Sequence, residues 1–189
     1  MLEECLISLK KGFPIIFPTE TVYGIGVDVL NNDAVNLLYR IKKRDPKKPF
    51  SLHFYKVEII YEYAFVNAKI EKIIEKFLPG PVTLVLKAKD SAPYNAVRNG
   101  KIGIRIVKNE KFFELMKEYK NPIVGTSVNE AGKPPFLGPH QIECSEFSIY
   151  PILEDGIKSN KPSTVIDCTT EPFTIIREGD NIKELKSYL

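Results

Sequence analysis

The chain has 189 residues, of which 43% are hydrophobic and 27% are charged, with 27 basic and 24 acidic side chains. This length and composition indicate one globular domain with a substantial core. A formal net charge of +3 is too small to indicate nucleic-acid binding by itself. Because no apolar run approaches transmembrane length, a membrane protein is not expected.

Cysteine and histidine usage argues against a structural metal site. Cys5, Cys144 and Cys168 are widely spaced, and His53 and His140 lack ligand spacing, so a zinc site is not expected. The N-terminal residues include acids and lack an apolar segment typical of a signal peptide. We therefore expect a cytoplasmic protein in a reducing compartment, with no membrane partner.

Apolar periodicity, capping residues and Gly/Pro stops predict the elements in chain order. The first half of the chain is predicted to hold a helix at 2–11, a strand at 13–17, a helix from Asn32 or Asp33 to about Arg44, a strand at 50–54, a helix at 67–78 and a strand at 82–87. An exposed loop at 91–100 is followed by a strand at 102–107, a helix at 109–119 and a strand at 122–126. The rest is predicted to hold loops at 127–139 and 151–162, strands at 164–168 and 173–177, and a helix after Asp180. Strands that alternate with helices predict a single α/β domain over residues 1–189, and connections without a helix predict a mixed sheet.

The first strand runs into a polar turn that is rich in hydroxyl groups and glycine. Its residues are Thr19, Glu20, Thr21, Tyr23, Gly24 and Gly26. Such a turn at a sheet edge exposes hydroxyls and backbone N–H groups where α/β proteins usually bind ligands. About twenty residues later, Lys42 and Arg44 bring two cations to a helix end, so the combination predicts an anionic ligand.

Each cation also has a structural interpretation. Lys42 and Arg44 alone are more simply explained as solvated charges at a helix C-terminus, although the irregular segment that follows is typical of a ligand-holding loop. Arg105 lies in a strand expected to be covered on both faces, so it needs either a protein carboxylate or a ligand anion as partner. The same argument applies more weakly to Arg177 at a strand end.

Several polar residues flank the predicted strands. Ser127 and Asn129 follow one strand directly, while Ser163 and Thr164 precede another. These residues can form ordinary turns, or they can hold a nucleotide or amino acid through hydroxyl and amide groups. His53 lies within a strand, and a structural role is the simpler interpretation for it in isolation.

Standard catalytic fingerprints are absent from the sequence. There is no G-x-x-x-x-G-K-[ST] loop, no third glycine at the dinucleotide-binding spacing and no G-x-S-x-G turn. The cysteines have no histidine or cation nearby in sequence, so a thiol nucleophile is not indicated. Any chemistry is therefore expected to depend on positioning and charge stabilisation.

Seven blocks in order along nearly the whole chain resemble one family. They are P-T-E-T-V-Y-G-I-G, K-K-R with Pro49 and His53 beyond it, F-L-P-G-P-V-T-L-V-L, G-I-R-I, S-V-N-E-A-G, P-S-T-V-I-D and I-I-R-E-G. Together they resemble the YrdC family of threonylcarbamoyl-AMP synthases. The family's K-x-R and S-x-N motifs fall on Lys42, Arg44, Ser127 and Asn129.

The sequence departs from the family pattern at two positions. Asp45 stands where a proline usually follows the arginine of K-x-R, and Val128 stands where S-x-N usually has a small residue. The acid is expected to weaken the local positive field or shift the loop, and the valine to tighten the pocket. Because the chain ends soon after I-R-E-G, it resembles the short, single-domain members.

The resemblance implies a YrdC/RibB-like fold, in which a twisted mixed sheet flanked by helices surrounds a concave, positively charged cavity. It implies that L-threonine, bicarbonate or CO2, and ATP give threonylcarbamoyl-AMP and pyrophosphate for tRNA modification, with Mg2+ held mainly by the ATP phosphates. Cations would contact phosphates or the threonine carboxylate, and polar groups would fix threonine and nucleotide. The implied residues are Lys42, Arg44, Ser127 and Asn129 in catalysis, and Thr19, Tyr23, His53, Arg105, Ser163, Thr164 and Arg177 in substrate binding.

Two alternatives stay open at this point. The same basic concavity could bind double-stranded RNA or tRNA, as in an RNA-binding or ribosome-associated factor. Cations concentrated at 42–48 and otherwise mixed with acids favour a small-ligand pocket instead. A related domain could also handle carbamoyl-AMP within a larger protein, and the lack of zinc-finger cysteines speaks against that. Proteins that transfer the product to tRNA are expected partners.

Overall fold

The computed structural model describes residues 1–130, 132–156 and 159–189. Within these ranges the strands belong to one nine-stranded sheet: β1 Ile15–Phe17, β2 Gly24–Asp28, β3 Ser51–Phe54, β4 Val82–Lys87, β5 Val97–Arg98, β6 Lys101–Ile106, β7 Ile123–Ser127, β8 Thr164–Asp167 and β9 Thr174–Arg177. The helices are α1 Leu2–Lys10, α2 Asn32–Ile41, α3 Glu58–Tyr63, α4 Ala68–Phe77, α5 Glu110–Tyr119, α6 Pro139–Glu143 and α7 Ile182–Tyr188.

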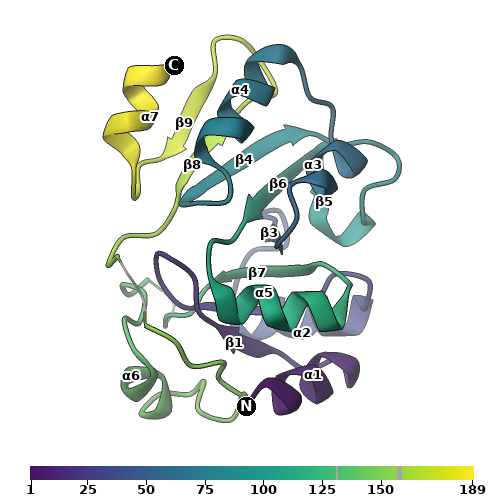
Figure 1. Cartoon of the computed structure of the whole chain (residues 1–189). Helices are drawn as coiled ribbons and strands as arrows, with labels where there is room; N and C mark the ends of the chain where they lie inside the picture. The colour runs from purple at the N-terminus through teal and green to yellow at the C-terminus, as the bar shows by residue number, and fades with distance from the viewer. Residues whose placement is uncertain (131, 157–158) are drawn as a thin grey trace.

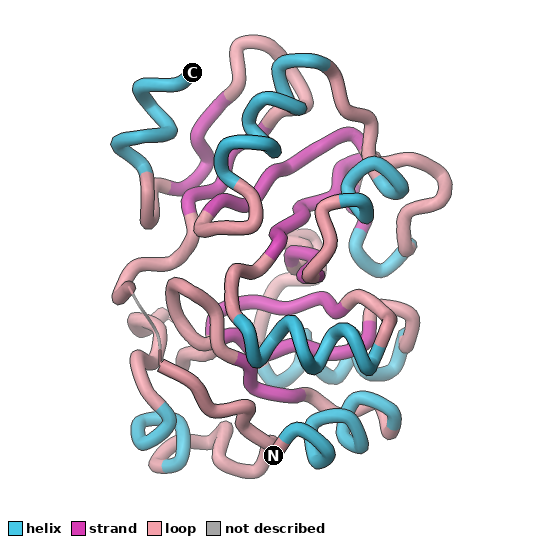
Figure 2. Tube along the Cα trace, viewed as in Figure 1, coloured by secondary structure: helices cyan, strands magenta, loops and turns pink. Residues whose placement is uncertain are grey.

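The sheet is mixed, as the pattern of connections predicts. Its order is β1-β2-β7-β3-β6-β4-β8-β9, and β5 pairs with β6 beside this path. The pairs β3–β6 and β4–β8 are parallel, whereas the other pairs are antiparallel. Figure 1 shows α4 and α7 beside the β4–β9 half, and α1, α2 and α5 beside the half that contains β1 and β7. The twisted strands run through the middle of the molecule between these helices (Figure 2).

Alternation along the central strands separates an apolar face from a polar one. On β6, Ile102, Ile104 and Ile106 are fully buried in the core, whereas Gly103 and Arg105 line a cavity. Because successive side chains point to opposite faces, the same division extends to the neighbouring strands. The register His53↔Arg105 on β3 and β6 therefore brings a histidine and an arginine to one face.

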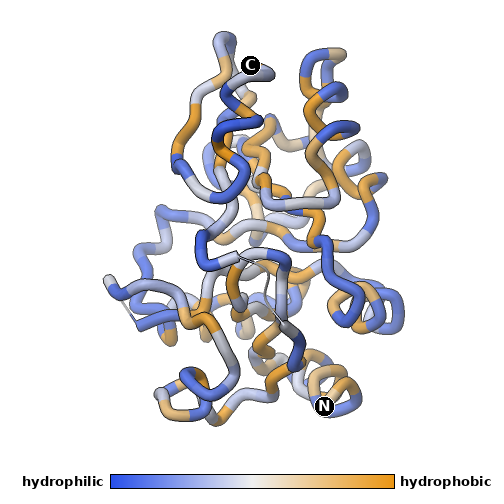
Figure 3. Tube along the Cα trace, turned by 60° about the vertical axis from the view of Figure 1, so that its left-hand side comes forward, coloured by the Kyte–Doolittle hydropathy of each residue, from blue (hydrophilic) through white to orange (hydrophobic). Residues whose placement is uncertain are grey.

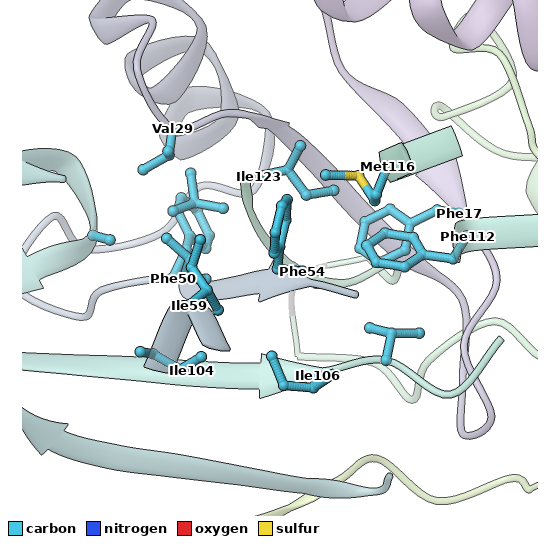
Figure 4. Close-up of a cluster of buried hydrophobic side chains, with 14 of the residues drawn as sticks. Phe17, Val29, Phe50, Phe54, Ile59, Ile104, Ile106, Phe112, Met116 and Ile123 are labelled. Atoms are coloured by element: carbon cyan, nitrogen blue, oxygen red, sulfur yellow. The ribbon is translucent and has the colours of Figure 1, made fainter. Parts of the chain in front are cut away.

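An aromatic cluster joins the first strand to α5. The Phe17 and Phe112 rings lie 5.0 Å apart, and Figure 4 shows them beside Met116. Phe17 is fully buried because Gly24 leaves room for its ring: a Cβ at Gly24 would approach the Phe17 ring to 2.5 Å. A glycine is thus required here by close packing.

The helices are amphipathic, which explains how they cover the sheet. Figure 3 shows apolar and polar segments alternating along them. On α4, Ile73 and Ile74 are buried, while the side chain of Asn67 caps the first turn by accepting hydrogen bonds from Lys69 N and Ile70 N. A polar N-cap and an apolar stripe are the sequence features that define such a helix.

The structure corrects several predicted elements. Gly24 and Gly26, expected in a turn, lie in β2, because the chain reverses before them over residues 18–23. The caps are Asn31 for α2 and Asn181 for α7, rather than Asn32 or Asp33 and Asp180. The segment at 91–100 is a short 3-10 turn followed by β5, not an open loop. Helices α3 and α6 were not predicted because each has only one or two turns.

The outer edge of β1 is covered by a later segment. Ile16 N donates to Pro151 O at 2.9 Å, and Leu153 N donates to Ile16 O at 2.8 Å. The predicted loop at 151–162 includes positions outside the described ranges, as does the loop at 127–139. In the described part of the chain, no helix has both the length and the apolar character that crossing a membrane requires.

Candidate functional site

A cavity of about 310 Å³ opens on the polar face of the sheet. Strands from both halves of the sheet contribute to it, because β2, β7, β3, β6, β4, β8 and β9 all carry lining residues. Most of the predicted site residues lie in this lining: Thr19, Tyr23, Arg44, His53, Arg105, Ser127, Ser163 and Arg177. The structure thus brings together groups that are far apart in the sequence.

The polar turn after β1 is held by its own hydroxyl groups. Thr19 Oγ1 donates to Val22 O at 2.7 Å and accepts from Thr21 N at 3.0 Å. The Tyr23 hydroxyl donates to Asp155 O and accepts from Asp155 N at 3.1 Å. Burial raises the pKa of Tyr23 above its usual value, so the phenol stays protonated and ties the turn to the 150s segment.

Arg105 has a protein carboxylate as its partner and also lines the cavity. Its Nη2 donates to Glu20 Oε1 at 2.9 Å and to Thr21 Oγ1 at 2.7 Å, and it lies 3.3 Å from Thr19 Oγ1. Both members of this ion pair are buried. The protein carboxylate does not exclude a ligand anion as a second partner, because Arg105 also lines the cavity; its Nε has no hydrogen-bond acceptor among the described residues.

His53 lies next to Arg105 and is neutral. Burial, helped by the positive charge of Arg105, lowers the pKa of His53 to about 3. Its ring packs edge-on against Phe17 with the centroids 5.5 Å apart. The Nδ1 atom is buried without a hydrogen-bond partner among the described residues. A purely structural role for His53 therefore does not explain why this ring nitrogen is buried without a hydrogen-bond partner.

Lys42, Ser127 and Asn129 form one hydrogen-bonded cluster at the side of the cavity. Lys42 Nζ donates to Asn129 O at 2.6 Å and to Asn129 Oδ1 at 3.0 Å, and Ser127 Oγ donates to the same Oδ1 at 3.2 Å. Desolvation, then repulsion by Arg44, lowers the pKa of Lys42 to about 8. Ser127 lines the cavity, whereas Lys42 and Asn129 lie outside the lining and hold Ser127 through this cluster.

The segment at 45–49 wraps around the Arg44 guanidinium. Arg44 Nε donates to Lys48 O and Nη2 donates to Pro49 O, both at 2.9 Å. Asp45, the departure from the family pattern, accepts a hydrogen bond from Lys47 N at 2.9 Å through its carboxylate. It therefore shapes the turn and is exposed to solvent. Arg44 also lines the cavity.

The other departure, Val128, does not tighten the cavity as expected. Its side chain is fully buried in the hydrophobic core, and only its neighbour Ser127 is part of the lining. Alternation along the chain explains this, because adjacent residues in an extended segment face opposite sides. Val128 N also donates to Tyr23 O, which fixes the segment after β7.

Ser163 and Thr164 have different positions relative to the cavity. Arg177 Nε and Nη2 donate to Ser163 O at 3.1 and 2.9 Å, and Ser163 Oγ lies 2.9 Å from Thr83 Oγ1. Thr164 instead donates to Asp180 O at 2.6 Å and points away from the lining. The structure thus gives Thr164 a packing role that the sequence did not distinguish.

Sequence reasoning named Glu20 only as a member of the polar turn, and it missed Thr83, Lys101 and Asp167, which also shape the site. Lys101 lines the cavity and forms an ion pair with Asp167 at 2.8 Å. The alternation that placed Arg105 also places Lys101 on the same face, so this signal was available. The Thr83–Ser163 contact depends on the β4–β8 pairing, and the Glu20–Arg105 pair joins residues far apart in sequence.

Four cations line the cavity, namely Arg44, Lys101, Arg105 and Arg177. Desolvation and the positive charges of Arg105 and Arg44 lower the pKa of Arg177, which indicates that the three guanidinium groups lie within electrostatic reach. Glu20 and Asp167 neutralise two of the four charges. Two lining cations have no ion-pair partner among the described residues, and the positive charge of the cavity as a whole stays a prediction.

Comparison with known proteins gives a consistent picture. The Sua5_yciO_yrdC family model, described as "Telomere recombination", matches residues 8–179. A protein of Methanocaldococcus jannaschii, provisionally named a threonylcarbamoyl-AMP synthase, is 37% identical over 181 residues, which cover 95% of this chain and 86% of that protein. A threonylcarbamoyl-AMP synthase of Pyrococcus abyssi is 30% identical over 190 residues.

A solved structure is similar over the whole chain. The crystal structure of Pyrococcus abyssi Sua5 complexed with L-threonine superimposes with a TM-score of 0.90 at 27% identity, covering 100% of this chain and 57% of that one. The chain also spans only 55% of the curated Pyrococcus abyssi synthase. The similarity therefore applies to roughly half of these longer relatives.

Proposed function

The chain belongs to the Sua5/YciO/YrdC family, and from this premise we propose that it is a threonylcarbamoyl-AMP synthase. The proposed substrates are L-threonine, bicarbonate or CO2, and ATP. The threonine amine takes up CO2 and loses a proton to give a carbamate, a carbamate oxygen then bonds to the α-phosphorus of ATP, and the bond to pyrophosphate breaks. Threonylcarbamoyl-AMP and pyrophosphate are the products.

The observation that carries the proposal is the convergence of motif residues on one cavity. Arg44, Arg105, Ser127 and Arg177 come from separate motifs of the sequence and line the same space. Fixed cations in a partly enclosed site stabilise the negative charge that develops around a triphosphate. Threonine-complexed Sua5 has the same fold, which supports threonine as the amino-acid substrate.

The chain's own residues would act by binding and orientation. Arg44 and Arg177 would contact phosphate oxygens, and Ser127 would hold the nucleotide or threonine through its hydroxyl. Lys42 would support Ser127 through Asn129 and add a positive charge behind the phosphates. Such preorganisation supplies much of the rate acceleration in phosphoryl-group chemistry.

Mg2+ would enter with the ATP phosphates. Within the described ranges, no group of three or more His, Cys, Asp or Glu side chains could hold a metal ion. The cavity lining supplies hydroxyls and cations, which do not make a protein-held Mg2+ site. We also propose that product transfer to tRNA requires downstream proteins; cytoplasmic location stays a prediction.

The test is pyrophosphate release from ATP and Mg2+, measured with and without L-threonine and bicarbonate. Release that requires both would support the proposal, and Arg44→Ala should reduce it at least about a hundredfold, since charged groups at such sites contribute several kcal/mol. Lys47→Ala, an exposed cation in the same segment, should keep the wild-type rate. Absence of release together with salt-sensitive binding of double-stranded RNA would instead favour the RNA-binding alternative.

A further inference from the structure

Arg105 is the most deeply buried cation of the cavity, and one short turn holds it. Its side chain is 6% exposed, and its Nη2 contacts Glu20, Thr21 and Thr19 at 2.7–3.3 Å. All three acceptors belong to the turn between β1 and β2. One end of the guanidinium is therefore fixed in direction, which a flexible arginine in solvent would not be.

Glu20 reaches the cavity through its ion pair with Arg105. Its side chain is 9% exposed, and both carboxylate oxygens are occupied: Oε1 accepts from Arg105 Nη2 at 2.9 Å and Oε2 from Lys108 N at 3.0 Å. Glu20 is not part of the cavity lining. A buried carboxylate with both oxygens paired is rigid, so the position it gives to Arg105 is rigid too.

The fixed guanidinium and the neighbouring histidine both carry polar atoms that lack protein partners. Arg105 Nε is buried and has no acceptor among the described residues, and His53 Nδ1 beside it also lacks a partner. Leaving a buried polar group unsatisfied costs about 1–3 kcal/mol. Arg105 and His53 also line the cavity, so a ligand held there would lie against the two side chains that carry these unsatisfied atoms. We call this place the Arg105 subsite, formed by Thr19, His53 and Arg105.

The charge of the Arg105 subsite differs from that around the other two arginines. Arg44 and Arg177 are held by backbone carbonyls, and within the described residues neither forms an ion pair. Arg105 is neutralised by Glu20. Because Coulomb energy scales with charge, neutralising a cation weakens its attraction for a doubly charged phosphate more than for a singly charged carboxylate.

We propose that Glu20 is a positioning residue that directs Arg105 toward a singly charged carboxylate and keeps phosphate out of the Arg105 subsite. The inference rests on the proposed function, in which the carboxylate is that of L-threonine. Glu20 thereby separates the amino-acid end of the cavity from the polyphosphate end, where Arg44 and Arg177 keep their full charge.

Two substitutions at Glu20 separate the effect of the side chain's charge from the effect of its length. Glu20→Gln keeps the length and removes the charge, so inorganic phosphate should bind about tenfold more tightly and should become competitive with threonine. Its KM for threonine should rise about tenfold, because Arg105 loses its charged anchor, with a smaller change in KM for ATP. Glu20→Asp keeps the charge, so phosphate should stay non-competitive with threonine although threonine binds more weakly.

Controls separate this role from a structural one. Asp28→Asn removes another buried carboxylate, 8% exposed and bonded to Tyr119, Asn121 and Leu30 away from the cavity, and should change neither KM nor inhibition. Thr21→Val removes an uncharged acceptor of Arg105 and should raise the threonine KM without admitting phosphate. This variant and Glu20→Asp carry the test if Glu20→Gln does not fold.

The proposal is overturned if folded Glu20→Gln keeps the wild-type threonine KM and inhibition pattern, or if Thr21→Val leaves the threonine KM unchanged. Calorimetric titration with inorganic phosphate gives a readout that does not depend on turnover. If wild-type protein releases no pyrophosphate, the proposed function fails, yet stronger phosphate binding by Glu20→Gln would still support the charge assigned to Glu20. Equal phosphate binding by both proteins would contradict it.

Discussion

Lys42 shows how the environment of one residue sets its chemistry. Its ammonium is partly desolvated, faces Arg44 and lies 5.2 Å from the centre of the Phe147 ring. These surroundings lower its pKa from 10.5 to about 8, although Glu146 opposes the shift. Asn129 compensates by offering two oxygen acceptors. A lysine poised near physiological pH is a feature that functional sites often share.

The lowered pKa of Lys42 predicts a pH dependence of catalysis. The kcat/KM for ATP should fall as pH rises through about 8, because the free enzyme loses the Lys42 charge there. Lys42→Arg should remove this alkaline decline, since arginine stays protonated. Heteronuclear NMR of Nζ would report the titration directly. A midpoint near 10.5 in the free protein would contradict the prediction, and Lys47→Arg serves as the control.

The buried neutral His53 predicts a pH dependence of stability. Its folded pKa of about 3 lies below the ordinary histidine value of 6.5, so between these pH values the unfolded chain binds a proton that the folded chain does not. The free energy of unfolding should therefore decrease as pH falls from 6.5 toward 3, by up to about 1.4 kcal/mol per pH unit. Urea unfolding of the wild type and of His53→Asn at several pH values measures this slope, as the difference between the free energies of unfolding of the two proteins at each pH. If the free energy of unfolding changed with pH equally in both proteins, the prediction would be contradicted.

Residues of the site differ in how far sequence could identify them. Arg105 was recognisable because a charge in a buried strand needs a partner, and period-two alternation set its face. The identity of that partner, Glu20, was not recognisable, because the ion pair depends on how the β1–β2 turn meets β6. Local patterns report faces and caps, whereas pairings between distant residues require the sheet register.

At the scale of elements, the packing of β1 against β2 and β7 depends on the absence of side chains. Gly24, Gly26 and Gly125 have no room for a Cβ: the Phe17 ring lies against Gly24, and backbone oxygens lie within 3 Å of the other two positions. Gly24 and Gly125 also line the cavity. These strands can therefore approach closely while supporting the site.

Gly24→Ala should destabilise the fold by about 2 kcal/mol, because the added methyl group would lie 2.5 Å from the fully buried Phe17 ring. Gly138→Ala is the matched control, since it has open space around it and an extended backbone with φ of −162°. The free energy of unfolding from urea titration measures both changes. Equal stability of the two variants would show that the ring moves away without cost.

Elements with strong local signals were predicted, and those without were not. The apolar stripes of α2, α4 and α5 and the β-rich runs of β4 and β6 lie where the sequence places them. The strand β2 was missed because its two glycines resemble turn residues, and only its pairing with β1 and β7 makes it a strand. Tertiary context overrides propensity in such cases.

At the scale of the whole molecule, the cavity joins the two halves of the sheet. Thr19, Tyr23 and Ser127 come from the β1–β2–β7 half, whereas Ser163 and Arg177 come from the β4–β8–β9 half. His53 and Arg105 lie between them on β3 and β6. A ligand that fills the cavity would contact both halves at once, so its binding should stabilise the fold as a unit.

ATP and L-threonine together should raise the melting temperature, because a ligand at one hundred times its Kd adds about 2.7 kcal/mol to the free energy of unfolding. Arg177→Ala should lose most of the rise caused by ATP and keep the rise caused by threonine. Differential scanning calorimetry measures both. Lys186→Ala, an exposed cation on α7, should respond as wild type does. Loss of the threonine effect in Arg177→Ala would contradict the division of the cavity.

The packing of Phe17 on Gly24 links two positions that cannot drift independently during evolution. A larger residue at 24 becomes tolerable once the ring at 17 has been replaced by something smaller, and either order of the two changes passes through a less stable single variant. Substitutions at these sites should therefore be epistatic in sign: Phe17→Leu, harmful alone, should become protective in a Gly24→Ala background. The pair would constrain which sequences are reachable one mutation at a time.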